Sequence, residues 1–331
     1  MRKFIIIFVI SILCLNNINA EIVSVSGRKI LVNDSLYTIK GICYHPVPKG
    51  SYNRSFDHLS QDLALMVEVG INTIRVYSPI TNKAVLDQIH EAGLKVIVSF
   101  GYNQGGNNDI LSGSFINYIN TFKHHDAILF WELGNEYNYH PEWFSNNIQN
   151  WYNALNKAAD LIHQNDPFHP VATAHGELPN MLALNSCQNI DIWGMNVYRW
   201  DNPEGIFTEW NAVSSKPMYL SEAGTDSYMS AAVNGYNHGE NEKMQADATK
   251  NILDDIFRYS DICSGVTLFA FVDEWWKAGN SFTQDNGGTA PKSSGVPYDG
   301  DANEEYWGII KMDRTKKMAF KVVKKIYKGL R

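Results

Sequence analysis

Residues 128–136 read Ile128-Leu129-Phe130-Trp131-Glu132-Leu133-Gly134-Asn135-Glu136. An apolar run that ends in a glycine and polar residues predicts a buried strand with reactive side chains at its carboxyl end. The same pattern recurs at regular intervals on both sides of this segment. The predicted strands are Tyr37–Cys43, Thr73–Tyr77, Lys95–Phe100, Ile128–Leu133, Val171–Ala174, Ile192–Val197, Met218–Ser221 and Val266–Phe271.

Segments with the helical spacing of apolar residues lie between these strands and after the last one. The clearest of these predicted helices are Asp57–Val69, Lys83–Ala92, Trp143–His163, Glu242–Tyr259 and Thr315–Tyr327. Eight strands that alternate with helices, without a linker rich in Gly, Ser or Pro, predict an α/β fold: one closed parallel (β/α)8 TIM barrel. A doubly wound open sheet is the rival fold. The segment Gly41–His45 argues against it, because the glycine spacing of a dinucleotide-binding loop is missing there.

Two further segments complete the expected single domain. A short hairpin over residues 23–32, turning near Asn33 and Asp34, precedes the first barrel strand. The longest irregular segment, residues 278–305, is rich in Gly, Ser and Asn and follows the last strand. A barrel displays such a loop at its carboxyl-terminal face, beside the active site.

The composition is typical of an ordered globular protein. The 331 residues are 44% hydrophobic, 12% aromatic and 19% charged. With 28 Lys and Arg against 35 Asp and Glu, the net charge is -7, which gives no electrostatic reason to expect a nucleic acid or an anionic lipid as a partner. Nine Trp and 17 Tyr supply flat side chains that stack on sugar rings as readily as they fill cores.

The first 20 residues are typical of a secretory signal peptide. Arg2 and Lys3 precede the apolar stretch 4–15, and Ala20 provides a small residue at the expected cleavage point. We therefore expect a secreted or periplasmic domain over residues 21–331. A buried N-terminal element and a lipidated N-terminus at Cys14 are the alternatives. There is no second apolar stretch of membrane-spanning length.

Two acidic residues stand where a barrel presents reactive groups, at the carboxyl ends of the fourth and seventh strands. They are Glu136 and Glu222. Strands four and seven face each other across an eight-stranded barrel, so both carboxyl groups would enter one cleft. Like charges and unequal surroundings keep one carboxyl protonated while the other is ionised. Cleavage of a glycosidic bond needs such a pair, one to protonate the leaving oxygen and one to attack or activate water at the anomeric carbon.

These residues carry a resemblance to a known clan. The segments 39–45, 70–77 and 129–136, with Glu222, resemble the first, second, fourth and seventh strands of the retaining glycoside hydrolases that are built on the (β/α)8 barrel. Within that clan, the chain is most similar to the β-1,3-glucanosyltransferases of fungal cell walls and to the catalytic barrels of family 2 glycosidases. The resemblance extends over almost the whole of residues 21–331.

The resemblance implies a role for each matching residue. Glu222 would be the nucleophile, oriented by Arg75 and Tyr198, and Glu136 the general acid and then the base. Asn135 would donate to the 2-hydroxyl of the sugar. Further substrate-binding candidates at the strand ends are Tyr44, His45, Tyr77, His175, Trp275 and Trp276. Since Trp275 and Trp276 are adjacent, we expect only one of them to face the sugar.

Other polar residues do not indicate a metal or a cofactor. We expect Glu132 to be a buried, hydrogen-bonded structural acid. The run His124-His125-Asp126 lacks the spacing of a catalytic zinc site and is interpreted as a solvated loop. Cys43, Cys187 and Cys263 form neither a disulfide framework nor a zinc pattern. The motifs of phosphate loops, nucleophile elbows and zinc proteases are missing, so no cofactor is expected.

Together these features predict an exported retaining β-glycosidase that hydrolyses a β-glucan-type polysaccharide or oligosaccharide. We expect a monomer whose partner is a carbohydrate. Two alternatives remain open at this point: a β-1,3-glucanosyltransferase, in which an acceptor sugar replaces water, and a catalytically silent barrel that only binds sugar.

Overall fold

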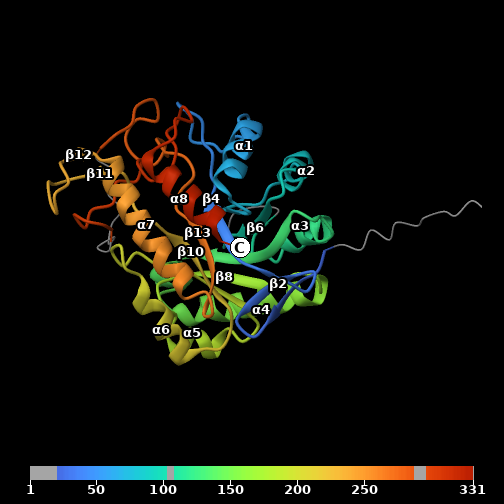
Figure 1. The fold of residues 1–331 in the computed structure, drawn as a ribbon. Coiled ribbons are helices and arrows are strands. Elements are labelled where there is room, and N and C mark those ends of the chain that lie inside the picture. The colour runs from blue at the N-terminus through green and yellow to red at the C-terminus, as the bar shows by residue number, and fades with distance from the viewer. Residues whose placement is uncertain (1–20, 103–107, 287–295, 331) are drawn as a thin grey trace, which may run out of the picture.

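The computed structural model of the protein describes residues 21–102, 108–286 and 296–330. The predicted signal peptide lies outside this part of the chain. Eight parallel strands form a closed barrel, with helices around it (Figure 1). In chain order the barrel strands are β4 (Ile39–Cys43), β5 (Thr73–Val76), β6 (Lys95–Phe100), β7 (Ile128–Asn135), β8 (Val171–Gly176), β9 (Ile192–Asn196), β10 (Met218–Ala223) and β13 (Cys263–Leu268). Neighbours in the chain are neighbours in the barrel, and β13 closes it against β4. The predicted (β/α)8 barrel is confirmed.

The barrel strands are apolar on both faces because both faces are covered. Residues 128–131 of β7, for example, are all apolar and all buried. One face of a barrel strand meets the packed barrel interior and the other meets the surrounding helices, so the strands show continuous apolar runs rather than alternation.

Helices fill the connections between strands and form the outer ring. They are α1 (Leu59–Val69), α2 (Lys83–Glu91), α3 (Phe115–Phe122), α4 (Ile148–Asn165), α5 (Met181–Ser186), α6 (Glu204–Val213), α7 (Glu242–Arg258) and α8 (Met318–Gly329). Four of them begin after an asparagine whose side-chain oxygen accepts from a first-turn N–H group, as expected of an N-cap. These caps are Asn82, Asn147, Asn180 and Asn241. The last helix, α8, packs against both α7 and α1 and so completes the ring (Figure 1).

A small antiparallel sheet precedes the barrel and covers its amino-terminal end. It consists of β1 (Val23–Ser26), β2 (Lys29–Val32) and β3 (Ser35–Tyr37). Val23 and Ile30 pack with Ile39, Ile97 and other residues near the beginnings of the barrel strands. The sheet has three strands rather than the two of the predicted hairpin, because the chain turns at Gly27-Arg28 as well as at Asn33-Asp34.

Several predicted boundaries are wrong by a few residues. The predicted strand Tyr37–Cys43 is divided between β3 and β4, and the last barrel strand begins at Cys263 instead of Val266. The predicted helix Trp143–His163 begins only at Ile148. A 3-10 turn over Pro141–Phe144 comes first, and two left-handed residues separate it from α4.

The carboxyl-terminal side of the barrel carries the longer loops. A two-stranded ribbon, β11 (Tyr228–Met229) with β12 (Gly239–Glu240), follows β10. The described parts of the predicted loop 278–305, residues 278–286 and 296–305, contain no helix or strand. None of the helices in the described part of the chain is long and apolar enough to cross a membrane.

Candidate active site

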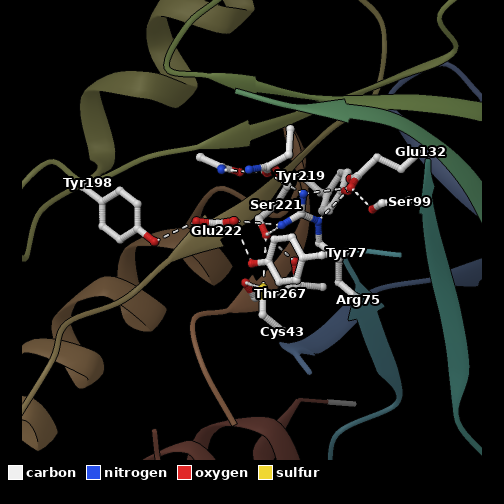
Figure 2. Close-up of polar contacts among 12 residues, drawn as sticks. Cys43, Arg75, Tyr77, Ser99, Glu132, Tyr198, Tyr219, Ser221, Glu222 and Thr267 are labelled. Carbon is white, nitrogen blue, oxygen red and sulfur yellow. Dashed lines mark hydrogen bonds and ion pairs between the residues drawn. The ribbon is translucent and has the colours of Figure 1, made fainter. Parts of the chain in front are cut away.

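Glu222 lies at the end of β10 and is held by three donors from two other segments, one at the end of β5 and one after β9. Arg75 Nη1 lies 2.9 Å from Oε1, and the hydroxyl of Tyr77 donates to the same oxygen at 2.7 Å. The hydroxyl of Tyr198 donates to Oε2 at 3.0 Å (Figure 2). Both oxygens of the carboxylate are therefore fixed, and the anion is stabilised by a positive charge and two hydroxyl groups.

Arg75 is buried and bridges Glu222 to a second carboxylate. From its place on β5, its Nε donates to Glu132 Oε1 at 2.8 Å. Glu132, on β7, also accepts hydrogen bonds from the hydroxyls of Ser99 and Tyr219 (Figure 2). It is fully buried, as the sequence predicts for a structural acid. The arginine charge is thus shared between a structural carboxylate and one that faces the cleft.

Asn135 ends β7 with its amide orientation fixed. Its Oδ1 accepts from Arg75 Nη2 at 2.8 Å and from Asn196 Nδ2 at 3.1 Å. Asn196, at the end of β9, accepts in turn from Ser221 Oγ at 2.7 Å. Because both bonds to Asn135 end on its oxygen, Nδ2 is left to donate to a ligand. Asn196 is not among the predicted residues, and only its position at a strand end could have indicated it.

Glu136 follows Asn135 in a left-handed conformation, with φ of 56°. Its N–H donates to the carbonyl of Ala174 at 2.9 Å, which fixes this backbone. Burial, with the charge of Glu222 adding to it, raises the pKa of Glu136 to about 7. Near neutral pH a large fraction of this carboxyl group is therefore protonated, while Glu222 lies against a guanidinium.

Aromatic side chains surround the carboxyl pair. The His45 ring lies 6.3 Å from Tyr77 and 5.2 Å from Trp276. Burial lowers the pKa of His45 to about 4, so this ring is neutral. Trp275 instead lies under Lys49, whose Nζ is 4.9 Å from the ring centre. Of the two adjacent tryptophans, Trp276 is thus the one that packs with the group of aromatic side chains next to Glu222.

Two predicted pocket residues point elsewhere, and for them the prediction is wrong. Tyr44 is fully buried and donates to Asp62 of α1 at 2.8 Å. His175 lies against Tyr152 of α4, with 3.3 Å between Nε2 and the hydroxyl. Consecutive residues of a strand point to opposite faces. Because the residues next to Tyr44 and His175 face the barrel interior, these two side chains point outward into the layer of helices.

The described residues do not offer a metal site. No group of three or more His, Cys, Asp or Glu side chains is arranged to hold a metal ion in residues 21–102, 108–286 and 296–330. His125, which the sequence analysis assigns to a solvated loop, contacts Asp87 at 3.0 Å. The three cysteines of this part of the chain are buried free thiols.

The barrel, with this pair of carboxyl groups, matches a known family. The family described as glycosyl hydrolases family 2, TIM barrel domain, matches residues 23–331. The chain belongs to this family. The match covers nearly all of the described structure, including every residue placed around Glu222, so the family 2 barrel of this chain contains the whole candidate site.

Solved structures of family 2 enzymes share the fold. A β-galacturonidase from Eisenbergiella tayi superposes with a TM-score of 0.69 at 24% identity, covering 94% of this chain and 55% of that one. A β-glucuronidase from Faecalibacterium prausnitzii also gives 0.69, at 19% identity, covering 94% of this chain and 52% of that one. At these identities the likeness shows the fold alone.

A relative with a described activity matches part of the barrel. The 1,3-beta-glucanosyltransferase gas5 of Schizosaccharomyces pombe is 27% identical over an alignment of 235 residues, and the match covers 58% of this chain and 44% of that protein. This chain thus spans about half the length of the proteins it resembles.

Proposed function

We propose that this family 2 barrel is a retaining β-glycosidase with Glu222 as nucleophile and Glu136 as acid and base. One observation carries the proposal. Three donors hold Glu222 as a carboxylate, while Glu136 nearby has a pKa raised to about 7 by burial and by the charge of Glu222. Two carboxyl groups in different protonation states are what double displacement requires.

In the first step, Glu136 gives its proton to the glycosidic oxygen. Glu222 attacks the anomeric carbon, the bond from that carbon to the leaving oxygen breaks, and the leaving sugar departs with the proton. The result is a glycosyl ester on Glu222 and an ionised Glu136. Asn135 Nδ2 donates to the 2-hydroxyl, a bond that strengthens as the oxocarbenium-like transition state forms.

In the second step, the ionised Glu136 takes a proton from water. The water oxygen attacks the anomeric carbon, the ester bond breaks, and Glu222 leaves as a carboxylate that Arg75, Tyr77 and Tyr198 stabilise. Two inversions at one carbon return the β configuration.

We propose a β-glucan-type polysaccharide or oligosaccharide as the substrate. The neutral, aromatic lining around Glu222 supports a sugar ligand, because sugar rings stack on such faces. Transfer to an acceptor sugar is the second candidate, supported by the partial likeness to a 1,3-beta-glucanosyltransferase. In that reaction an acceptor hydroxyl replaces water in the second step.

We also propose that the protein is exported as a monomer. Arg2, Lys3 and the apolar stretch after them support export, with cleavage after Ala20. The N-terminal sequence of protein collected outside the producing cells tests the cleavage point, and light scattering tests the monomer.

The activity is tested by incubating the purified protein with defined β-glucan, mannan and galactan oligosaccharides. Product masses are compared with those from a Glu222→Ala control. Shorter products identify the hydrolysed sugar, and products longer than the input identify transfer. If wild type and control both leave the panel intact, the catalytic proposal fails and sugar binding alone is the function to test.

The mechanism is tested separately with a 2-deoxy-2-fluoro β-glycoside that has a good leaving group. Fluorine slows both steps, and the leaving group restores the first, so a glycosyl-enzyme accumulates. We expect the added mass on the peptide that contains Glu222. Labelling of another carboxyl group would contradict the assignment of the nucleophile.

A further inference from the structure

Three charged residues form a compact group after the last barrel strand, which we name the Glu274–Lys277–Glu304 triad. Lys277 Nζ lies 2.8 Å from Glu274 Oε2 and 3.0 Å from Glu304 Oε2. Glu274 is almost completely buried, with a side-chain exposure of 4%, whereas Lys277 and Glu304 keep 18% and 23%. One cation therefore lies between two carboxyl groups, of which Glu304 retains access to solvent.

The triad borders the candidate active site through a single aromatic layer. Lys277 Nζ lies 4.2 Å from the centre of the Phe269 ring. Phe269 packs edge-on against Tyr77, which donates to Glu222. The charge of Glu304 contributes to the raised pKa of Glu136, and that of Glu222 to the raised pKa of Glu274, as expected for neighbours across one cleft.

Three buried polar atoms without partners lie on the same wall. Within the described residues, His45 Nδ1, Trp276 Nε1 and Trp307 Nε1 are buried without a hydrogen-bond partner. Trp307 packs on both Phe269 and Tyr198, so these atoms lie around the same pair of carboxyl groups. Buried polar atoms are nearly always paired, so this grouping indicates a ligand that brings several hydrogen-bonding oxygens. Sugar hydroxyl groups both accept from N–H groups and donate to a carboxylate such as Glu304.

The charges on this wall oppose a sugar that carries its own carboxylate. Arg75 is committed to Glu132 and Glu222, and Lys277 to its two glutamates. Two other cations lie near this wall and keep their charges: Arg54 donates to the neutral carbonyls of Ser78 and Pro79, and Lys49 is exposed over Trp275, where solvent screens it. Like charges at close range in a partly buried cleft cost several kcal/mol.

We infer that the Glu274–Lys277–Glu304 triad makes this cleft selective for uncharged β-glycosides and excludes uronic acids. Glu304 and Lys277 would bind hydroxyl groups, and the surplus carboxylate would repel a uronate. This inference rests on the proposed glycosidase function and narrows its substrate class. It also separates this chain from the β-galacturonidase and β-glucuronidase whose fold it shares.

The test uses substrate pairs that differ only at the sixth carbon: p-nitrophenyl β-glucoside with β-glucuronide, and β-galactoside with β-galacturonide. We expect wild-type kcat/KM for the better neutral substrate to exceed that for its uronide by about tenfold or more. Equal or better cleavage of the uronides would overturn the inference while leaving the glycosidase proposal intact.

Variants assign the selectivity to the triad. Glu304→Gln, and Glu274→Gln with Glu304→Gln, keep the size of each side chain and remove negative charge. Both variants should lower the ratio of kcat/KM for the neutral substrate to kcat/KM for the uronide. We expect the double variant to lower this ratio by about tenfold. Glu68→Gln is the matched control, because Glu68 also contacts two lysines, Lys316 and Lys324, but on the exposed surface of α1. A ratio that responds equally to all three variants would contradict the assignment.

A binding measurement tests the same selectivity for neutral sugars without catalysis. Calorimetric titration of wild type with a neutral β-linked disaccharide and with its uronic counterpart measures the selectivity directly. Tighter binding of the neutral sugar supports the inference even if neither is cleaved, a result that would reject only the proposed activity. Equal binding overturns it. Thermal unfolding of each variant checks that the buried Glu274→Gln change leaves the fold intact.

Discussion

At the scale of single residues, Arg75 sets the electrostatics of the site. Its one positive charge lies between Glu132 and Glu222, at 2.8 Å and 2.9 Å. Glu132 and Glu222 share the guanidinium of Arg75. Ser99 and Tyr219 hold Glu132 in place by donating hydrogen bonds to it. Glu222 thus has a guanidinium and two hydroxyl donors at the edge of the cleft, while burial and the charge of Glu222 raise the pKa of Glu136 to about 7.

The raised pKa of Glu136 predicts the pH dependence of the reaction. The first step needs protonated Glu136, so kcat/KM should fall as the pH rises through about 7. A pH profile of kcat/KM on the best natural-linkage substrate measures this. Glu136→Gln should lower activity on that substrate by about 10²- to 10⁴-fold.

An activated leaving group provides the control for this prediction. A dinitrophenyl glycoside needs no acid in the first step, so Glu136→Gln should still release the phenol in a burst, and the fall near pH 7 should disappear. Persistence of that fall in Glu136→Gln would show that another group titrates.

At the scale of elements, closure of the barrel depends on a close approach between β13 and β4. Gly265 on β13 has φ of +126°, and a Cβ atom there would lie 2.1 Å from the carbonyl oxygen of Ile39. Backbone atoms cannot yield as a flexible side chain can. A residue without a side chain is therefore required where the last strand meets the first.

Gly265→Ala should destabilise the protein more than the loss of glycine flexibility alone explains. Gly93, with φ of +78° and no atom within 4 Å of the point that a Cβ would occupy, is the matched control. Gly93→Ala should cost about 1–2 kcal/mol, the usual penalty of a left-handed alanine. Gly265→Ala should exceed it, because a backbone clash is added. Urea unfolding measures both, and equal losses would contradict the role of the close approach.

At the scale of the whole molecule, Lys317 joins the last helix to the loops above the barrel. This fully buried residue lies just before α8. Its Nζ contacts Asp273 Oδ1 at 2.6 Å, Ser227 Oγ at 2.8 Å and the carbonyl of Tyr306 at 3.1 Å. Segments from three regions of the sequence are therefore tied at one ammonium group, on the side of the barrel that carries the triad and Glu222.

Lys317→Met should lower the free energy of unfolding by about 3–5 kcal/mol, because Asp273 is left buried without its cation. The double variant Lys317→Met with Asp273→Asn should recover part of this loss. Lys321→Met, on the exposed face of α8, should change stability by no more than about 0.5 kcal/mol. Chemical unfolding of the three variants measures these differences. A double variant less stable than Lys317→Met would contradict the ion-pair explanation.

The sequence by itself determined the barrel and the location of its chemistry. Continuous apolar runs indicate strands that are buried on both faces. Because these strands alternate with segments of helical periodicity, few folds are compatible with the sequence. Parallel strands of a barrel end at one face, so Glu136 and Glu222, about 90 residues apart in the chain, were placed in one cleft by topology alone. The resemblance to the barrel glycoside hydrolases, not topology, placed Arg75 and Tyr198 beside Glu222, and both lie within hydrogen-bond distance of it.

Only the tertiary structure decided which side chains enter that cleft and how charge is balanced there. A one-residue difference in strand phase turns a side chain from the cleft to the helices, which is why Tyr44 and His175 were misplaced. Asn196, Trp307 and Glu304 come from separate loops and strand ends without a motif. Their proximity arises from the way loops fold over the barrel, and no local pattern in the sequence encodes which distant segments will meet.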